Sequence, residues 1–180
     1  MSLKKREIDH LTSWANRNNT SVDVDQIEKI ECYLQLIKSW SRRINLVSPN
    51  DLNVLLERHF IDSLTPIQEI TAGAFILDVG SGGGFPGIPI AIMRIDTKMH
   101  LLESIHKKTL FLAKAKEVLG LDNIIVIEKR LEEFSSETKY DIATMRALPH
   151  WERAIGVIRP LLKPDGKIIY YEKIGLYKLL

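Results

Sequence analysis

The stretch that most constrains the fold is residues 74–89, AFILDVGSGGGFPGIP, in which an apolar run ends in a cluster of glycines. The apolar run over 75–79 predicts a short buried strand. The glycines after it allow positive φ angles and let a ligand approach the backbone. Pro86 and Pro89 suit the opening turn of a helix over 87–94. A strand, a glycine turn and a helix in this order are typical of the nucleotide-cofactor crevice of an open α/β sheet.

Two acidic residues indicate which cofactor this crevice takes. Asp78 stands two residues before Gly80, and Glu103 ends the next apolar segment, 19 residues after Gly84. An acid this close to the turn would repel a pyrophosphate, which argues against NAD and favours the positively charged sulfonium and amino group of S-adenosylmethionine. The pattern D-x-G-x-G-x-G with a strand-end Glu resembles the Rossmann-like methyltransferases. NAD binding, or a glycine turn without a ligand, stays as an alternative.

The rest of the chain predicts an α/β fold with a helical cap. Beyond residue 73, strands and helices alternate, which predicts a mostly parallel sheet with helices on both faces. The expected strands are 75–79, 99–103, 123–128, 140–145 and 166–171, and the expected helices are 87–94, 106–119 and 150–162, with a turn at 163–166. Before residue 72 the spacing predicts helices over 4–16, from Asp23 or Asp25 through Ile37, and over 52–64.

Length and composition suit one soluble domain. The 180 residues are expected to form a single domain, with a cap over 1–72, a cofactor-binding core over 73–172 and a tail over 173–180. No apolar run approaches the length of a membrane span, and the start of the chain lacks a signal-peptide core. The single cysteine, Cys32, forms no internal disulfide, and no Cys/His cluster has metal spacing. A cytoplasmic protein without a metal or membrane partner is expected.

The ends of the later strands carry further candidate residues, because ligands of such sheets lie beyond the carboxyl ends of the strands. Leu131 and Glu132 follow the third strand and are expected to face an adenine, although Glu132 can equally be a solvated loop acid. Arg146 follows the fourth strand, where a transferred methyl would meet its acceptor. The structural alternative pairs Arg146 with Asp141 or Asp78.

The absence of two motifs narrows the range of possible methyl acceptors. The fourth strand is not followed by the Asn/Asp-Pro-Pro-Tyr motif of enzymes that methylate exocyclic amines, and Cys32 lies far from any strand end. These absences favour an acceptor that is already nucleophilic, such as guanine N7, for which positioning and electrostatics suffice. An arginine can grip guanine O6 and N7 or a phosphate.

Several segments together resemble the GidB (RsmG) methyltransferase family. They are the segments 42–46 (RRINL) and 58–64 (RHFIDSL), the cofactor motif 77–89 with its Phe-Pro-Gly, and then Lys107-Lys108, Phe111-Leu112, 130–133 and Arg146-Ala147. The resemblance covers about residues 25–172.

The resemblance implies methylation of guanine N7 in the 530 loop of bacterial 16S ribosomal RNA, with S-adenosylmethionine as the donor and the small ribosomal subunit as partner. By position, the cofactor contacts of the family fall on Gly80, Phe85, Leu131, Glu132 and Arg146. The acids and the glycine turn add Asp78, Gly82 and Glu103, and Arg146 is also the candidate catalytic residue. The candidate RNA contacts are Arg42, Arg43, Arg58, His59, Lys107 and Lys108.

These candidate RNA contacts have plainer interpretations as well. The net charge is only +2, and each basic pair can be an ordinary solvated face. His59 can instead hydrogen-bond Asp62 or a backbone group of its own helix.

The chain departs from the family after residue 172, where only a short tail over 172–180 follows. The family continues with another strand pair, so the strand at 166–171 is expected to be an exposed apolar edge that favours self-association. A shortened variant, a frameshifted gene or a clipped protein would explain the difference. The alternatives to an active RNA methyltransferase are a methyltransferase of small molecules and an inactive remnant that binds cofactor or RNA.

Overall fold

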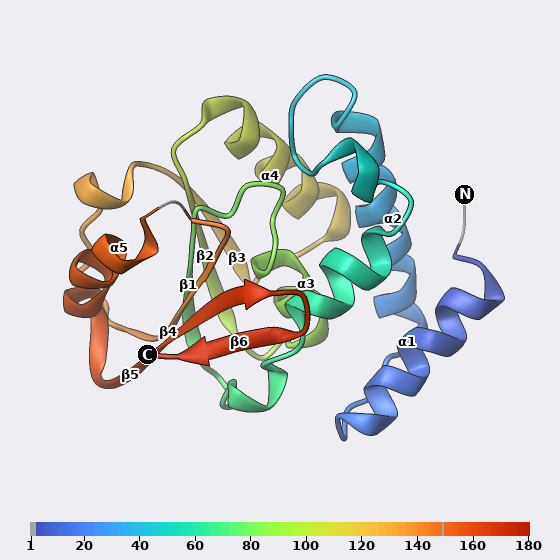
Figure 1. Ribbon diagram of the computed structural model, residues 1–180, viewed down its shortest axis with the longest axis horizontal. Helices are drawn as coiled ribbons and strands as arrows, with labels where there is room; N and C mark the ends of the chain where they lie inside the picture. The colour runs from blue at the N-terminus through green and yellow to red at the C-terminus, as the bar shows by residue number, and fades with distance from the viewer. Residues whose placement is uncertain (1–2, 149) are drawn as a thin grey trace.

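The computed structural model describes residues 3–148 and 150–180, and a single six-stranded sheet forms its centre (Figure 1). The strand order is β3-β2-β1-β4-β5-β6, in which β1 to β5 are parallel and β6 is antiparallel to β5. The strands are β1 (Phe75–Val79), β2 (Lys98–Glu103), β3 (Ile124–Glu128), β4 (Tyr140–Arg146), β5 (Leu162–Lys173) and β6 (Leu176–Leu179). The predicted α/β class with a mostly parallel sheet is confirmed.

The helices cover both faces of this sheet. They are α1 (Lys5–Arg17), α2 (Val24–Trp40), α3 (Gly87–Met93), α4 (His106–Leu119) and α5 (Trp151–Ile158). One hydrophobic cluster packs the four helices α1, α2, α3 and α4 against one face of the sheet. A second cluster packs α5 against the other face. Figure 1 shows α5 on the left of the sheet and α1, α2 and α3 on the right. Among the described residues, no helix is long and apolar enough to cross a membrane.

The strand register brings the candidate site residues together at the carboxyl ends of the strands. Val79 pairs with Leu102 on one side and with Met145 on the other, so β1, β2 and β4 end side by side. Glu103 pairs with Glu128 at the end of β3. Because parallel strands share their carboxyl edge, the glycine turn after β1, Glu103 and Arg146 meet at the same end of the sheet.

The N-terminal helices dock on the core through specific contacts. The Asp23 side chain caps α2 by accepting a hydrogen bond from the Gln26 amide at 2.8 Å, and the Gln26 side chain accepts one from the Asp23 amide in return. Further along the buried stripe of α2, the Tyr33 hydroxyl donates to the carbonyl of Gly83 at 2.6 Å. The cap therefore rests directly on the glycine turn.

The helix expected over 52–64 is shorter and wider than predicted. Residues 55–63 are helical, and Leu56–Ile61 form a π-helical turn. Such turns are rare and concentrate at functional sites, since they change which carbonyl groups are free to accept hydrogen bonds. Short 3-10 turns occupy Pro49–Asp51, Ile67–Glu69, Leu131–Glu133 and Arg159–Leu161.

Three expectations for the C-terminal part need correction. Helix α5 ends at Ile158 rather than 162, because a 3-10 turn containing Pro160 follows it. The predicted turn at 163–166 lies within β5, although the register passes from Leu162 directly to Lys167 opposite β4, so these residues bulge out of the ladder. The strand expected to be an exposed edge is not one. The tail folds back as β6 and pairs with β5 along its length from Ile169 to Lys173.

Gly87, the first residue of α3, tests how tightly this core is packed. A Cβ atom there would lie 2.3 Å from Leu101 Cδ2 and 2.8 Å from Asp78 Oδ2. We expect Gly87→Ala to lower the free energy of unfolding by about 1–3 kcal/mol, since overpacking forces buried groups apart. The matched control is Gly156→Ala in α5, where nothing lies within 4 Å and the change should stabilise by roughly 0.5–1 kcal/mol. Urea unfolding followed by circular dichroism measures both, and a neutral Gly87→Ala would contradict the packing described.

Candidate functional site

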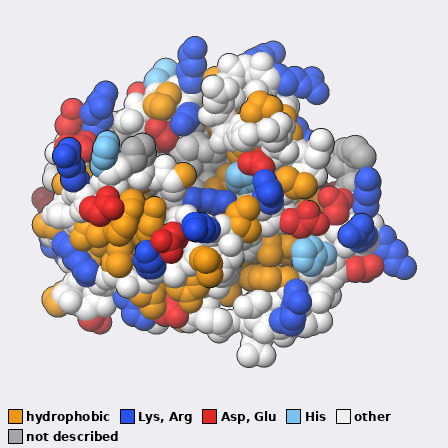
Figure 2. Space-filling model, viewed as in Figure 1, with side chains coloured by type: hydrophobic (Ala, Val, Ile, Leu, Met, Phe, Trp, Pro, Cys, Tyr) orange, Lys and Arg blue, Asp and Glu red, His pale blue; other side chains and the backbone are white. Residues whose placement is uncertain are grey.

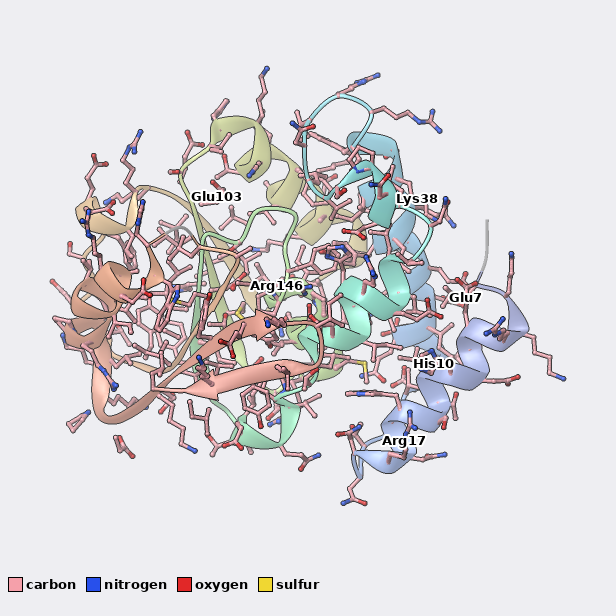
Figure 3. The ribbon with its side chains drawn as sticks, viewed as in Figure 1. Glu7, His10, Arg17, Lys38, Glu103 and Arg146 are labelled. Carbon is pink, nitrogen blue, oxygen red and sulfur yellow. The ribbon has the colours of Figure 1, made fainter. Side chains whose placement is uncertain are left out.

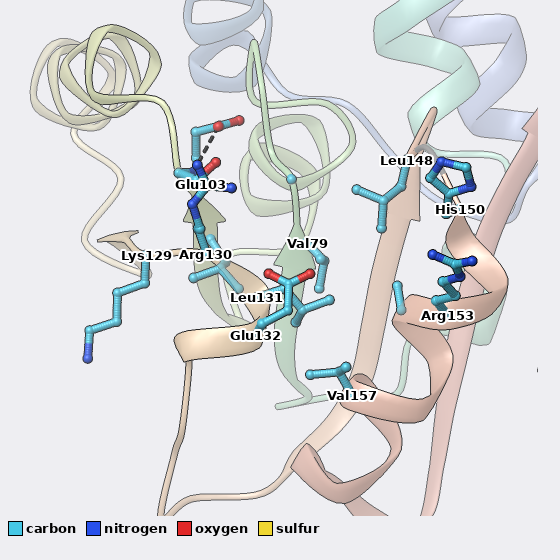
Figure 4. A pocket seen from close by; sticks show the side chains of 14 residues that line it. Val79, Glu103, Lys129, Arg130, Leu131, Glu132, Leu148, His150, Arg153 and Val157 are labelled. Carbon is cyan, nitrogen blue, oxygen red and sulfur yellow. Dashed lines mark hydrogen bonds between the residues drawn. The ribbon is translucent and has the colours of Figure 1, made fainter.

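A cavity of about 510 Å³ opens at the carboxyl ends of β1, β2, β3 and β4 (Figure 4). Its lining comes from the glycine turn, the ends of β2 and β3, the turn at 131–133 and α5. The lining residues are Val79, Gly80, Leu102, Glu103, Ser104, Lys129, Arg130, Leu131, Glu132, Leu148, His150, Arg153, Ala154 and Val157. A wider hollow of about 850 Å³ lies at the opposite, amino end of the strands and contains none of the predicted site residues.

The glycine turn presents bare backbone to this cavity. Gly80 has a φ of +69° and donates its amide to the Leu102 carbonyl at 2.8 Å. A side chain at Gly80 would meet only the tip of Leu148, at 3.3 Å, so the surface beside Gly80 is open. Gly82 also has positive φ, +56°. The positive φ angles and the open approach are what the sequence predicted for these glycines.

Glu103 ties the glycine turn to the start of α4. One carboxylate oxygen accepts the Gly82 amide at 2.9 Å, and the other accepts the amides of Ser104 and Ile105 at 2.8 and 2.9 Å. The side chain is only 6% exposed, yet it lines the cavity. An ionised carboxylate offers roughly four acceptor positions, so Glu103 keeps acceptor capacity for a ligand hydroxyl.

Asp78 lies beneath the glycine turn and outside the cavity lining. It is fully buried, and its two oxygens accept from the Thr144 hydroxyl at 2.8 Å and the Gly87 amide at 3.3 Å. Burial raises the pKa of Asp78 to about 6, against the opposing effect of these hydrogen bonds. Asp78 therefore supports the loop that borders the cavity without lining it.

Arg146 points toward the cap and is held there. Its guanidinium lies 2.9 Å from Asp62 Oδ2 and donates to the Arg58 carbonyl at 2.9 Å. Longer contacts reach the Ser63 hydroxyl at 3.4 Å and the His59 carbonyl at 3.5 Å. The partner of Arg146 is thus neither Asp141 nor Asp78, the two acids that the structural alternative named. Figure 3 labels Arg146 near the end of β5, apart from Glu103.

Phe85 joins the glycine turn to the same part of the cap. Its ring is buried, with centroid distances of 5.3 Å to Tyr33 and 5.1 Å to His59. The His59 ring nitrogen Nε2 lies 3.2 Å from Asp51, rather than against Asp62. Burial, with the charge of Arg146, lowers the pKa of His59 below its ordinary value. Phe85 and Arg146 thus flank the cap side of the turn.

The remaining candidates divide between the cavity and the surface. Leu131 is half-buried and Glu132 exposed, and both line the cavity from the 3-10 turn after β3. Arg42, Arg43 and Lys107 are exposed, and Lys108 is half-buried. Arg58 is also exposed and pairs with Asp51 at 3.0 Å. The cavity therefore gathers Gly80, Glu103, Leu131 and Glu132. Gly82 lies in the turn but outside the lining, Asp78 lies beneath the turn, and Phe85 and Arg146 lie on its cap side.

Sequence reasoning missed the wall that faces Glu132. Leu148, His150, Arg153 and Val157 form it, from the β4–α5 connection and α5 (Figure 4). The spacing of Arg153, Ala154 and Val157 on one helical face is a signal in the sequence, but it does not say which partner that face meets. Within residues 3–148 and 150–180, no group of three or more His, Cys, Asp and Glu side chains is placed to hold a metal ion.

Comparisons with known proteins agree with this architecture. A family model described as "GidB: rRNA small subunit methyltransferase G" matches residues 26–174. The chain is 38% identical over 157 residues to Ribosomal RNA small subunit methyltransferase G of Chromobacterium violaceum, covering 84% of this chain and 75% of that protein. It is 42% identical over 135 residues to the protein of the same name from Laribacter hongkongensis, covering 75% of this chain and 65% of that protein.

Solved structures share the fold at low sequence identity. A SAM-dependent methyltransferase from Aquifex aeolicus superposes with a TM-score of 0.57 at 19% identity, covering 76% of this chain and 71% of that chain. A SAM-dependent methyltransferase from Geobacter sulfurreducens, in complex with S-adenosyl-L-homocysteine, gives a TM-score of 0.52 at 20% identity, covering 76% and 53%. These likenesses place the chain in the Rossmann-like class I methyltransferase fold.

The raised pKa of Asp78 predicts an unusual pH dependence of stability. Between about pH 4 and 6 the folded chain keeps a proton on Asp78 that the unfolded chain has lost, so the free energy of unfolding falls as pH rises through this window. We expect Asp78→Asn to remove that fall, which is about 2–3 kcal/mol. Urea unfolding at pH 4.5 and pH 7 measures it. Identical pH slopes in the wild type and the variant would contradict the assignment.

Asp96 is the matched control for this measurement. Its hydrogen bonds with Arg94 lower the pKa of Asp96 to about 2, the opposite direction. Asp96→Asn should therefore lose stability at pH 7, and the wild type should lose the same contribution only as pH falls below about 4.

Proposed function

Since the chain belongs to the GidB family of small-subunit rRNA methyltransferases, we propose that it transfers a methyl group from S-adenosylmethionine to N7 of a guanine in the 530 loop of bacterial 16S rRNA. The observation that carries the proposal is the cavity in which bare glycine backbone faces the strand-end carboxylate of Glu103. The substrate and the atom methylated rest on the family resemblance of the cofactor motif and of the RHFIDSL segment over 58–64.

The residues around the cavity fit S-adenosylmethionine. Glu103 has acceptor capacity for ribose hydroxyls, and Leu131 with Glu132 offers an apolar contact and polar groups to an adenine. Gly80 and Gly82 leave room for the methionine part, with Phe85 and Arg146 on the cap side and the charge of Asp78 below. When bound, this cofactor supplies an electrophilic methyl group on a positively charged sulfur. Two acids close to the turn favour a ligand of that charge over a pyrophosphate.

The chemistry asked of the protein side chains is modest. The lone pair of guanine N7 reacts without prior loss of a proton, so no general base is required. Positioning and electrostatic stabilisation then carry the rate enhancement. Arg146 is the candidate for this role because its guanidinium is held rigidly at the end of β4, next to the glycine turn.

Basic residues in segments that lie next to the glycine turn support an RNA substrate. Arg42 and Arg43 lie in the connection whose Leu46 carbonyl approaches Gly83, Lys107 and Lys108 follow Glu103 in the first turn of α4, and Arg58 with His59 lies in the π-helical turn. The cavity lining also includes Arg130, which belongs to the segment 130–133 of the family resemblance, and two cations that the sequence analysis did not name, Lys129 and Arg153. Figure 2 shows Lys and Arg side chains along the upper rim of the molecule, where the strands end. Such a rim suits a phosphate backbone.

We further infer a single domain that works in the cytoplasm on the small ribosomal subunit. One continuous cluster of buried side chains includes Leu11 and Tyr33 of the cap together with Ile76 and Leu101 of the sheet, which supports a cap and core that fold together. The matched segments span 75% and 65% of the two relatives, so the activity of the whole relatives is applied to this chain as a proposal.

The proposal is tested by transfer of labelled methyl from S-adenosylmethionine to small subunits that lack the modification, to naked 16S rRNA and to a reaction without acceptor. We expect label on the RNA, at a guanine that becomes sensitive to chemical cleavage at 7-methylguanine. Transfer to small molecules only would instead support the small-molecule alternative. Cofactor binding without any transfer would support the inactive remnant, and binding of NAD alone would overturn the cofactor assignment.

Two carboxylates at neighbouring strand ends, Glu103 and Glu128, provide a test variant and its matched control. Glu103→Gln replaces one acceptor oxygen by a donor that faces backbone amides, so we expect at least about tenfold weaker binding of S-adenosylhomocysteine in calorimetry and a parallel loss of transfer. Glu128→Gln changes the neighbouring strand end, where the carboxylate pairs with His106 outside the cavity lining, and should leave affinity within about twofold. Equal effects would contradict the role of Glu103.

RNA binding at the rim predicts a change in salt dependence. Lys107→Ala with Lys108→Ala should weaken binding of 16S rRNA fragments and lower the slope of log affinity against log salt by about 1 for each phosphate that the variant no longer neutralises. Lys114→Ala, on the same helix but two turns further on and paired with Glu117, is the control and should leave the slope unchanged. Filter binding between low and physiological salt measures both. An unchanged slope in the double variant would place the RNA elsewhere.

A further inference from the structure

We propose that Asp62 is the positioning residue for Arg146, holding the guanidinium in the orientation that methyl transfer requires. This inference rests on the proposed function. Asp62 is 5% exposed, and its carboxylate lies 2.9 Å from the Arg146 guanidinium. Neither the family resemblance nor the similar proteins assign a role to this acid.

The contacts of Arg146 leave it little freedom. Its Nη2 group approaches Asp62 and the Arg58 carbonyl, and its Nη1 group approaches the Ser63 hydroxyl and the His59 carbonyl. A guanidinium carries five N–H donors, four of them on these two nitrogens. Both terminal nitrogens are therefore engaged by the cap, and the guanidinium is fixed before any substrate arrives.

Asp62 links three separate parts of the chain. It belongs to the helix at 55–63, it pairs with the end of β4 through Arg146, and it accepts the amide of Gly175 in the turn between β5 and β6. The adjacent residue strengthens the link, since the Tyr171 hydroxyl of β5 donates to the Ser63 carbonyl. The position of Arg146 therefore depends on how the cap and the β5–β6 turn are seated.

The positive charge of Arg146 acts on a side chain that lies next to the glycine turn. Together with burial it lowers the pKa of His59, whose ring lies 5.1 Å from Phe85 in the turn. Removing the carboxylate of Asp62 would leave a largely buried cation without its counter-ion, and such a cation moves toward solvent or toward another acid. The nearest consequence is a change in the electrostatics and shape of the cap side of the site.

Asp62→Asn tests this role in the full chain, with transfer to 16S rRNA as readout. The amide keeps an oxygen for the Gly175 amide but loses the charge that faces Arg146. We expect kcat to fall at least about tenfold while KM for S-adenosylmethionine stays within about threefold, because Asp62 and Arg146 lie outside the cavity lining and every lining residue is unchanged. Asp62→Glu restores the charge and should recover part of kcat.

A double-mutant cycle separates positioning from a general structural role. In an Arg146→Met background, Asp62→Asn should lower transfer by less than about twofold, since its effect passes through Arg146. If Asp62→Asn lowers transfer by the same factor in both backgrounds, Asp62 acts through Gly175 and the proposal is overturned. The proposal would also be overturned if the wild type is active and Asp62→Asn transfers methyl groups at the same rate. No transfer by the wild type would overturn the proposed function and this role together.

A second Arg–Asp pair, whose aspartate is more exposed than Asp62, provides the stability control. Arg94 pairs with Asp96 at 2.8 Å and donates to the carbonyls of Ile70 and Thr71, at the amino end of the sheet. Asp96→Asn should lower the thermal midpoint but leave transfer unchanged at a temperature where the protein is folded.

A second variant, Ser63→Ala, serves if Asp62→Asn fails to fold. It removes a weaker contact of Arg146 and should lower kcat about two- to threefold. The Arg146→Met background should again abolish this effect. An unchanged kcat in Ser63→Ala, or the same loss in both backgrounds, would then overturn the proposal.

Discussion

Two buried carboxylates that accept backbone amides hold the functional end of this molecule together. A glycine turn with positive φ angles loses much conformational entropy when it is ordered, and it leaves amide groups without regular partners. Glu103 accepts three such amides, from the turn and from the start of α4, and Asp78 accepts the first amide of α3. The carboxylates thus fix the turn, and they place negative charge under and beside the cavity that the turn borders.

Buried charge also fixes backbone on the cap side, but there the charged group is a cation that donates to carbonyl groups. Arg146 donates to carbonyl groups of the π-helical turn and pairs with Asp62, while the Tyr33 hydroxyl donates to the carbonyl of Gly83. The cap is therefore attached to the sheet by buried polar contacts as well as by apolar packing. Buried polar groups need particular partners in particular orientations, so these contacts specify one seating of the cap where apolar packing alone would permit several.

The sequence was sufficient for features that depend on local pattern. The strand at 75–79 and the helix at 106–119 have the predicted bounds, because apolar periodicity and glycine placement act over a few residues. The clustering of Gly80, Glu103, Leu131 and Glu132 followed from one topological rule about parallel strands. The partner of Arg146 was not predictable, since Asp62 reaches it through the docking of the cap. The partner of His59 was missed for a local reason, because the chain turns between Asp51 and the helix at 55–63 and brings the two side chains together. The pairing of β6 with β5 was missed because its short sequence carries no clear strand pattern.

The buried position of Asp78 refines the electrostatic argument for the cofactor. A carboxylate that touches the ligand would select it by direct pairing, but Asp78 is fully buried and hydrogen-bonded to Thr144 and Gly87. Its raised pKa means that burial opposes its ionisation. A positively charged ligand above the turn would favour the ionised form and regain part of that cost, whereas a diphosphate would add to it. In this way the charge of Asp78 can favour a cationic ligand over a diphosphate without touching it.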